Sequence, residues 1–376
     1  MFRSVLHPGL LPIGIDIGSS SVKLAQLRRV RGGFEVVGSA RVECPTTDET
    51  VSAADAIDAI DRGIASAGLI GRHAVISIDD RLIRVRSART PRLTDDELDR
   101  SLSLDAPERL GMTEADDPVF GWLDAGEVRQ GEETWREAIL VGARGDVIED
   151  LVMGLAARGV RPLAVEPGFA AIARCYTRRL RRNADRGTSL AIVDVGERAT
   201  GIILTLGTSV CFYKLLELGD RDITRASCSR LSLDEASVVE LRRRRLVQAQ
   251  QGGNGTGDEK VQRALFEASR PVMRDIAQEI NLCLRHFGVS FRGARPSKIV
   301  LSGGLAQEPG FVEAIEEATR LTTAVGVPLE GTSVEDLRKV GPQLATAIGL
   351  SLRSEENAAR TKARSWTPRG KTGEAA

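Results

Sequence analysis

Two short segments of the sequence carry residues suited to phosphate and metal chemistry. The first, IGIDIGSSSVK at residues 13–23, is an alternating apolar run that an aspartate, a glycine and three serines interrupt. The alternation predicts a strand, and the Gly-Ser step predicts a tight turn before a second strand. Asp16 lies within the first strand, where a carboxylate is costly unless it is paired or binds a cation. The turn offers anion donors through the backbone of Gly18 and the hydroxyls of Ser19, Ser20 and Ser21. A hydrated divalent cation beside phosphate oxygens fits this set, and an ordinary hairpin with a solvated turn is the alternative.

The second segment, LAIVDVGERATGIIL at residues 190–204, repeats the first as strand, aspartate, glycine, turn, hydroxyl and strand. Asp194 and Gly196 take the places of Asp16 and Gly18, at the same separation in both pairs. We therefore expect a duplicated chain in which two α/β halves each open with a hairpin. Two facing hairpins would hold a phosphate chain from both sides, with one hydrated Mg²⁺ between the two aspartates. This arrangement needs a cleft between two lobes.

A third segment, KIVLSGGLAQEPGFVEAIEEATR from residue 298, predicts a strand, a turn at Gly303 and Gly304, and an amphipathic helix. The two glycines permit a flat ligand to approach the backbone, but strand-to-helix turns use glycine routinely. Two helices of small residues are expected in VEPGFAAIARCY from residue 165 and GPQLATAIGLSLR from residue 341. Such helices can cross closely and act as a hinge. Core packing is the simpler interpretation of both.

The composition indicates a globular chain of about two domains. Hydrophobic residues make up 42% of the 376 residues, and Lys plus Arg equal Asp plus Glu at 52 each. We therefore expect no nucleic-acid partner. Five scattered cysteines without CxxC spacing favour a reducing compartment, and three isolated histidines predict no structural zinc. No stretch approaches the ~20 apolar residues of a membrane span, and the N-terminus lacks the pattern of a secretory signal.

Taken in chain order, the five segments resemble the phosphate-1, first connecting, phosphate-2, adenosine and second connecting motifs of the actin-like ATPase superfamily. The resemblance implies ATP and Mg²⁺ as cofactors, with the metal bound through water by Asp16 and Asp194. It implies phosphate binding by Gly18, Ser19, Ser20, Ser21, Lys23, Gly196 and Thr200. It also implies adenosine binding by Gly219, Gly303 and Gly304. The expected catalytic residue is Glu166, at the position of the water-orienting acid of DnaK-type chaperones.

Within the superfamily, the chain resembles PilM, a cytoplasmic family of type IV pilus assembly proteins related to the cell-division protein FtsA. GIDIGSSSVKLAQL nearly repeats the family's opening, and LTDDELDRSLSLDAPERLGM resembles its stretch after the first subdomain. AILVGARGDVIEDLVMGLAARGVRPLAVEP resembles the segment that closes an inserted subdomain. The resemblance covers about residues 12–353. It implies an α/β, actin-like fold of two lobes built from duplicated RNase H-like subdomains, with a small inserted α/β subdomain.

The expected domain boundaries follow from this resemblance and from composition. They are an N-terminal tail at 1–11, the first part of the first lobe at 12–80, the inserted subdomain at 81–160, the connecting helix at 161–187, the second lobe at 188–353 and a disordered basic tail at 354–376. A Gly-rich flexible loop is expected near 249–259. The basic run before it, Arg242 to Arg245, is interpreted as a solvated helix end.

Two departures from the family pattern affect the nucleoside side of the site. LGDRDIT resembles a GGxxxT turn, but Asp220 replaces its second glycine and would repel phosphate without a bridging cation. EASVVE stands where an EAExxK helix is usual, so that Ser237 and Glu240 occupy the Glu and Lys positions. We therefore expect weak nucleotide binding and weak or absent hydrolysis.

These features predict a scaffold or adaptor of a type IV pilus or related secretion machine. The resemblance implies a PilN-like inner-membrane partner, whose short N-terminal cytoplasmic peptide docks in a groove beside the inserted subdomain. The expected location is cytoplasmic, peripheral at the inner face of the inner membrane. A basic run near that subdomain is a candidate for the docking surface, although a solvated strand face is the simpler account of Arg81, Arg84, Arg86 and Arg89.

Three alternatives stay open. The first is an active superfamily ATPase. The second is a small-molecule kinase, which needs a general base in the first lobe; the available carboxylates, none in a kinase-like motif, are Asp79, Asp80 and Asp105. The third is a filament former like FtsA or MreB, or another homo-oligomer, built through large head-to-tail interfaces.

Overall fold

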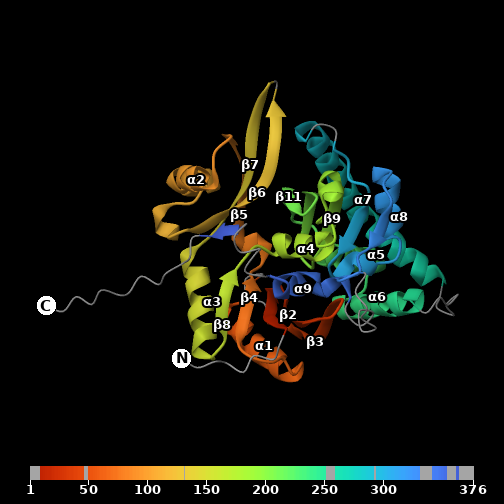
Figure 1. Cartoon of the computed structure of the whole chain (residues 1–376). Helices are drawn as coiled ribbons and strands as arrows, with labels where there is room; N and C mark the ends of the chain where they lie inside the picture. Colours follow the sequence, from red (N-terminus) through yellow and green to blue (C-terminus); the bar gives the residue numbers. More distant parts are fainter. Residues whose placement is uncertain are drawn as a thin grey trace.

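The computed structural model describes residues 9–45, 50–130, 132–250, 259–291, 294–330, 341–353 and 361–363. The expected N-terminal tail, Gly-rich loop and basic tail lie largely outside these residues. The described chain forms two lobes, and a small subdomain lies above the first lobe in Figure 1.

The first lobe is a five-stranded sheet with helices packed on it. Its strands are β1 (Leu10–Ile17), β2 (Ser21–Val30), β3 (Gly33–Glu43), β4 (His73–Ser77) and β8 (Arg161–Val165), in the order β3-β2-β1-β4-β8. β1 pairs antiparallel with β2 and parallel with β4. The alternating apolar side chains of Ile13 and Ile15 are fully buried in one core with α1 (Ala53–Ser66) and α3 (Gly145–Ala157). The hairpin predicted for residues 13–23 is confirmed.

The second lobe repeats this topology. Its strands lie in the order β11-β10-β9-β12-β13 and comprise β9 (Ser189–Val195), β10 (Thr200–Leu206), β11 (Ser209–Leu216), β12 (Ile299–Ser302) and β13 (Thr323–Val325). Each pair of neighbours runs in the same relative direction as its counterpart in the first lobe. The helices are α5 (Asp220–Leu231), α6 (Glu235–Gln250), α7 (Glu259–Ser290) and α8 (Phe311–Thr319). The predicted duplication is confirmed.

The small subdomain lies between β4 and α3 in the chain. It comprises β5 (Ile83–Pro91), β6 (Val119–Gln130) and β7 (Glu133–Ala143), with α2 (Asp95–Leu110) in the same apolar core. Thr94 caps α2 in a capping box with Glu97. The predicted end of this insertion at residue 160 differs from the structure, because α3 packs in the core of the first lobe against α1.

A fourth strand of the small subdomain comes from the far end of the chain. β14 (Thr361–Ala363) pairs with β6, so that the sheet order is β14-β6-β7-β5. The expectation of a disordered tail therefore differs from the structure at these three residues. The physical reason is that β6 offers an edge of unpaired backbone groups, which a sequence pattern within the tail does not reveal.

Two short helices of small residues are packed together at the centre of the molecule (Figure 1). They are α4 (Gly168–Thr177) and α9 (Ala345–Ser351). A Cβ on Gly349 would lie 1.9 Å from the carbonyl oxygen of Ala171, and one on Gly14 would lie 1.9 Å from that of Ala347. α9 therefore approaches both α4 and β1 more closely than any larger side chain permits.

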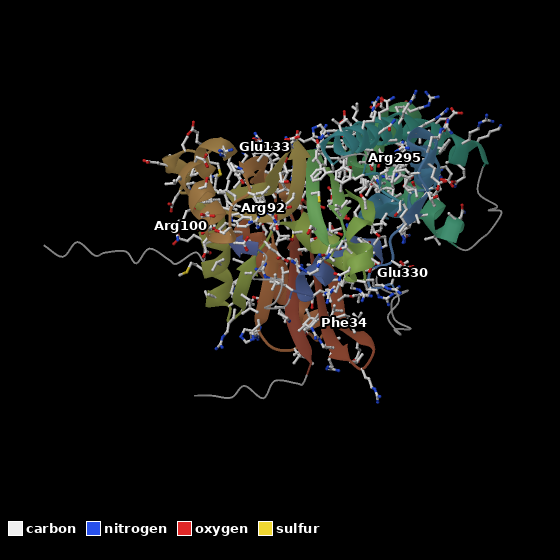
Figure 2. All side chains as sticks on the ribbon, turned by 45° about the horizontal axis from the view of Figure 1, so that its top comes forward. Phe34, Arg92, Arg100, Glu133, Arg295 and Glu330 are labelled. Atoms are coloured by element: carbon white, nitrogen blue, oxygen red, sulfur yellow. The ribbon has the colours of Figure 1, made fainter. Side chains whose placement is uncertain are left out.

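One apolar cluster joins the three parts of the chain. It contains Phe169 of α4, Ile203 of β10 and Ile139 of β7, all nearly inaccessible to solvent. Charged side chains instead cover the outside of the small subdomain, as Figure 2 shows for Arg92, Arg100 and Glu133. Short 3₁₀ helices connect several of the elements, namely η1 (Asp80–Leu82), η2 (Glu114–Asp116), η3 (Asn183–Gly187), η4 (Gly304–Gln307) and η6 (Pro342–Leu344).

Candidate functional site

A cleft of about 210 Å³ lies where the hairpins of the two lobes face each other. Asp16 and Asp194 both line it, at the carboxyl ends of β1 and β9, as the sequence repeat predicts. The structure also brings most of the predicted phosphate-binding residues into this lining, namely Gly18, Ser19, Ser20, Ser21, Lys23 and Gly196. The cleft is therefore the meeting point of the two duplicated halves.

The two aspartates have equivalent surroundings. Asp16 lies opposite Ser77 in the parallel β1–β4 pair and accepts a hydrogen bond from its Oγ at 3.0 Å. Asp194 lies opposite Ser302 in the parallel β9–β12 pair, and the Ser302 hydroxyl, which donates to the carbonyl of Pro342 at 3.1 Å, lowers the pKa of Asp194 against the larger effect of burial. Lys23 Nζ lies 3.2 Å from Asp16 Oδ2. Each lobe thus places one carboxylate at the cleft, opposite a serine on the neighbouring parallel strand.

Burial and charge shift the proton affinity of these groups. Burial raises the pKa of Asp194 to about 6, with repulsion from Asp16 adding to the effect and Lys23 opposing it. Burial alone would lower the pKa of Lys23, but attraction by Asp16 and Asp194 outweighs it and raises this pKa above its ordinary value. Lys23 therefore stays protonated and neutralises part of the charge of the two aspartates.

The two turns are bonded alike and touch each other. Gly18 and Gly196 each donate their backbone N–H to the carbonyl three residues later, at 3.0 and 2.9 Å. Ser20 Oγ donates a hydrogen bond across the cleft to the carboxylate of Glu197. Burial raises the pKa of Glu197. The Ser20 hydroxyl thus contacts a carboxylate of the other lobe in the cleft.

Thr200 differs from its predicted phosphate-binding position. It is fully buried, and its hydroxyl donates to the carbonyl of Leu218 at 2.7 Å. Its neighbours Ala199 and Gly201 line the cleft instead. The hydroxyl of Thr200 therefore anchors the loop before α5, because the β10 register turns it away from the cleft.

The three predicted adenosine glycines divide into two groups. Gly219 packs on the backbone of Glu197, where a Cβ would lie 2.5 Å from the carbonyl oxygen. Gly303, at φ 87°, packs on the backbone of Val195 with a Cβ-to-oxygen distance of 2.3 Å. Gly304 lines the cleft, and a Cβ there would meet open space. Two of the glycines thus permit close packing of loops, and one faces the cleft.

Asp80 is the cleft residue with the most unusual environment. It begins η1 after β4, and its Oδ2 accepts a hydrogen bond from the hydroxyl of Tyr213 at 2.6 Å. Its Oδ1 is buried and has no hydrogen-bond partner within the described ranges. Burial raises the pKa of Asp80 to about 7, against the effect of the Tyr213 hydrogen bond. Asp80 therefore offers a carboxylate oxygen to a cleft ligand.

The other two candidate kinase carboxylates are paired. Asp79 lines the cleft, and its carboxylate forms an ion pair with Arg81 at 2.7 Å. Asp105 lies on α2 of the small subdomain and forms an ion pair with Arg109 at 2.6 Å. Asp105 is therefore remote from the cleft, and Asp80 is the carboxylate of the three that could accept a proton there.

The cleft fits phosphate accompanied by a hydrated cation. Six carboxylates and four basic side chains line it, so a polyanion needs added positive charge to bind. Within the part of the chain that the structure describes, no three His, Cys, Asp or Glu side chains are grouped to hold a metal directly. Mg²⁺ usually keeps several waters in its coordination shell. Asp16, Asp194 and the unpartnered Oδ1 of Asp80 can accept hydrogen bonds from such waters. α4 also begins in the lining at Gly168, so the positive end of its dipole faces the cleft.

Asp220 has a partner that sequence reasoning missed. It is the first residue of α5 and lines the cleft. Arg242 of α6 bonds its carboxylate at 2.6 Å, and also bonds Glu308 at 2.9 Å and the Thr224 hydroxyl at 2.7 Å. The expected repulsion between Asp220 and phosphate is therefore largely offset, and Arg242 is not the solvated residue that the basic run suggested. The spacing in the sequence could have indicated this burial, because Arg242 lies four residues after the apolar Val238 and therefore on the same face of the helix. Val238 is fully buried.

The same ion cluster lies next to Asp220 and joins α6 to the segment after η4. Arg245 lies 3.3 Å from Glu308, so two arginines of α6 are tied to the segment after η4. Asp234 caps the start of α6, where its carboxylate accepts hydrogen bonds from the backbone N–H and the hydroxyl of Ser237. The carboxylate of Glu240 is paired on the exposed face with Arg243 and Arg244. The two positions expected to contact adenine and ribose thus lie outside the cleft lining.

Glu166 lies outside the cleft. Its carboxylate is 1% exposed and accepts two hydrogen bonds from Arg174, at 2.6 and 2.9 Å, and one from Arg353. Arg174 also bonds the carbonyl of Gly349 on α9 at 2.7 Å. The geometry does not support the expected water-orienting role, because two arginines turn the carboxylate toward α9. Glu166 ties α4 to the end of α9.

A second cavity, of about 90 Å³, lies between the small subdomain and the first lobe. Its lining is mostly apolar and comes from β6, β7, α3 and the ends of β4 and β8, with Val119, Phe120, Trp122, Leu123, Val141, Ile148 and Val165 among its residues. We call this cavity the β6 groove. Glu166 and Pro167 also line the groove, and Pro167 is the residue that precedes α4. The groove lining therefore continues directly into the start of α4.

The basic run of β5 belongs to solvent rather than to the groove. Arg84 and Arg86 are exposed on one face of β5. Arg89 is exposed on the other face and forms an ion pair with Glu137 of β7 at 2.5 Å. The solvated strand face is borne out for these three arginines, whereas Arg81 lines the cleft beside Asp79. In the described ranges, no helix is both long and apolar enough to cross a membrane.

The duplicated sheets and the cleft between them define an actin-like ATPase fold. One solved chain with this fold, from the PilM-PilN type IV pilus biogenesis complex, is 20% identical with a TM-score of 0.74, over 92% of this chain and 99% of that chain. A model of the family described as type IV pilus assembly protein PilM matches residues 14–355. The chain therefore belongs to the PilM family of type IV pilus assembly proteins.

Two further solved structures share the fold at lower similarity. The ethanolamine utilization protein EutJ from Carboxydothermus hydrogenoformans is 14% identical, with a TM-score of 0.55 over 93% of this chain and 92% of that chain. A diol dehydratase-reactivating factor is 10% identical, with a TM-score of 0.51 over 90% of this chain and 98% of that chain. At these identities the likeness concerns the fold alone.

Proposed function

We propose that this protein is a scaffold of a type IV pilus or related secretion machine that docks an extended peptide of an inner-membrane partner in the β6 groove. The observation that carries the proposal is the groove itself, an apolar cavity beside β6, whose outer side is paired in the described residues with the three-residue strand β14. An extended peptide can add main-chain hydrogen bonds along β6 while its apolar side chains enter the groove. A PilN-like protein is the proposed partner, because a related fold occurs in a PilM-PilN complex.

The proposed location is cytoplasmic, peripheral at the inner face of the inner membrane. In this proposal a short N-terminal cytoplasmic peptide of the partner is the anchor, because main-chain pairing and side-chain burial act together at one site. Membrane attachment should then depend on the partner rather than on lipids.

The peptide proposal is tested with a labelled synthetic peptide of the PilN-like partner's N-terminal cytoplasmic segment. Val119→Lys places a charge in the apolar groove, and we expect it to weaken binding at least about tenfold because an unpaired charge is costly there. The matched control is Leu104→Lys, since Leu104 is 87% exposed on α2 and is not a residue of the groove lining. Equal loss in both variants, or binding that neither substitution affects, would contradict docking in the β6 groove.

For the cleft, we propose weak binding of Mg²⁺-bound nucleotide through the phosphates, with little or no turnover. Support comes from the paired aspartates and turn donors on the phosphate side, together with the Arg242 and Glu308 cluster next to Asp220. If the nucleoside side contributes little, Mg²⁺-tripolyphosphate should bind within about threefold of Mg²⁺-ATP in calorimetry. Any phosphate release should depend on Asp80, whose raised pKa suits a general base, and not on Glu166. ATP binding that exceeds tripolyphosphate binding by two orders of magnitude would contradict this small contribution of the nucleoside side.

A further inference from the structure

The outer edge of β6 is paired with the chain's own C-terminal segment. In the antiparallel β14–β6 pair, Thr361 lies opposite Leu123, Lys362 opposite Trp122, and Ala363 opposite Gly121. The other edge of β6 pairs with β7 along its length. β14 appears as the short blue arrow beside the small subdomain in Figure 1. Without β14, β6 would be an edge strand with free backbone donors and acceptors.

The paired stretch of β6 coincides with the β6 groove. Gly121, Trp122 and Leu123, which face β14 across the pair, are all residues of the groove lining. An extended peptide that adds to β6 at the groove needs the same backbone N–H and carbonyl groups. One strand edge cannot pair with two chains at the same residues. β14 and a docked peptide are therefore mutually exclusive.

We propose that the C-terminal segment around residues 361–363 is a built-in competitor that holds the β6 edge until a partner peptide displaces it. The pairing stands on the strand register alone, whereas its regulatory consequence rests on the function proposed above. β14 lies beyond residue 355, where the family match ends, so the segment is an addition to the matched part of the chain. The competitor is thus carried by this chain's own extension.

The length of β14 suits a reversible contact. Three residues provide few ladder hydrogen bonds, and each exchanges with a hydrogen bond to water, so the segment binds weakly as a free peptide. Tethering raises its effective concentration to about the millimolar range. If the free segment bound with a Kd of about 0.1 mM, the tether would lower the apparent affinity for a competing peptide about tenfold. A tight partner would still displace it.

The test compares the full chain with a form that ends after Arg353, which keeps the ion pair to Glu166. The probe is a fluorescein-labelled synthetic peptide of residues 355–368 of this chain, followed by anisotropy. We expect it to bind the shortened form and to bind the full chain at least about tenfold more weakly, because the edge is already occupied there. No binding to the shortened form at millimolar peptide, or equal binding to both forms, would overturn the proposal.

Proline peptides show whether strand pairing is responsible. Alternate residues of an antiparallel strand direct their N–H groups to one neighbour, and proline has no N–H. Of two peptides, one with Lys362→Pro and one with Thr361→Pro and Ala363→Pro, at least one must therefore lose binding. The same substitutions in the full chain should speed hydrogen exchange of the β6 amides, which gives a readout that does not depend on truncation. Unchanged binding by both peptides would overturn the pairing.

A third arm separates this inference from the proposed function. The partner's N-terminal cytoplasmic peptide should bind the shortened form about tenfold more tightly than the full chain and should displace the labelled tail peptide. Equal partner binding to both forms would overturn the competition while leaving the proposed function intact. If the tail peptide binds the shortened form and the partner peptide binds neither form, the self-pairing is supported and the proposed function fails.

Discussion

Tyr213 of β11 donates a hydrogen bond to Asp80 at 2.6 Å, and this contact joins the second lobe to the end of β4 in the first. The ring of Tyr213 also stacks on Phe169 of α4, with 4.0 Å between the centroids. The carboxyl that receives the hydrogen bond has a pKa of about 7 because it is buried beside other carboxylates. Opening the cleft would return Asp80 to water and lower its pKa, so protonation of Asp80 favours the closed arrangement.

The pH dependence of stability should therefore change in Asp80→Asn. A carboxyl whose pKa is raised from 3.8 to about 7 holds its proton more tightly in the folded chain. Its contribution to stability is present below the unfolded pKa and is lost as pH rises through the folded pKa. Because asparagine does not ionise, the free energy of unfolding of the variant should rise relative to that of the parent between pH 4 and 7, by up to about 4 kcal/mol. Urea unfolding across pH 4 to 8 measures this.

Tyr213→Phe is the control for that experiment. The hydrogen bond from Tyr213 lowers the pKa of Asp80 against the effect of burial, so its removal should move the midpoint of the stability change to higher pH. A difference between Asp80→Asn and the parent that is constant over the whole range would show that Asp80 does not titrate there.

Glu166→Gln should reduce stability and leave phosphate binding unchanged. The substitution leaves the nearly buried guanidinium groups of Arg174 and Arg353 without their carboxylate, which typically costs about 3–5 kcal/mol. Asp16→Asn should give the opposite result, weakening Mg²⁺-tripolyphosphate binding through loss of a cleft carboxylate. Denaturant unfolding measures the loss of stability, and calorimetry measures the binding of Mg²⁺-tripolyphosphate. Loss of phosphate release in Glu166→Gln at unchanged stability would restore the water-orienting role.

Arg242→Gln should weaken phosphate binding through Asp220. Without the guanidinium, the Asp220 carboxylate keeps its full charge in the cleft lining and repels the ligand. We expect an affinity loss of about tenfold at low salt, and recovery of most of it in the double variant Arg242→Gln, Asp220→Asn. A double variant that binds as poorly as Arg242→Gln alone would mean that Arg242 acts through Glu308 and the shape of the loop instead.

Gly349→Ala should destabilise the contact between α4 and α9. The new Cβ would lie 1.9 Å from the carbonyl oxygen of Ala171, and backbone atoms cannot move aside without separating the helices. Overpacking of this kind typically costs about 1–3 kcal/mol, and more where backbone must shift. Gly187→Ala is the matched control, because a Cβ there meets nothing within 4 Å. Equal melting temperatures for the two variants would contradict the close crossing.

The sequence by itself determined the two hairpins, their duplication and the presence of Asp16 and Asp194 in one cleft. These features depend on local patterns: alternating apolar residues set the strands, glycine sets the turns, and repetition of the motif sets the symmetry of the lobes. The family assignment rested on the same motifs, and the match over residues 14–355 confirmed it. Local patterns also predicted the small-residue helices at the centre.

Only the tertiary structure decided which way the charged side chains point and what they meet. Arg242 reaches Asp220 and Glu308, Glu166 turns to Arg174 and Arg353, and β14 finds the edge of β6. In each case the partners are brought together by packing of elements that are separate in the chain. A buried charge takes whichever partner the fold places within reach, because leaving it unpaired costs more than any local preference supplies. Residue types therefore determined where this protein has a cleft, and packing determined which of its charges face into it.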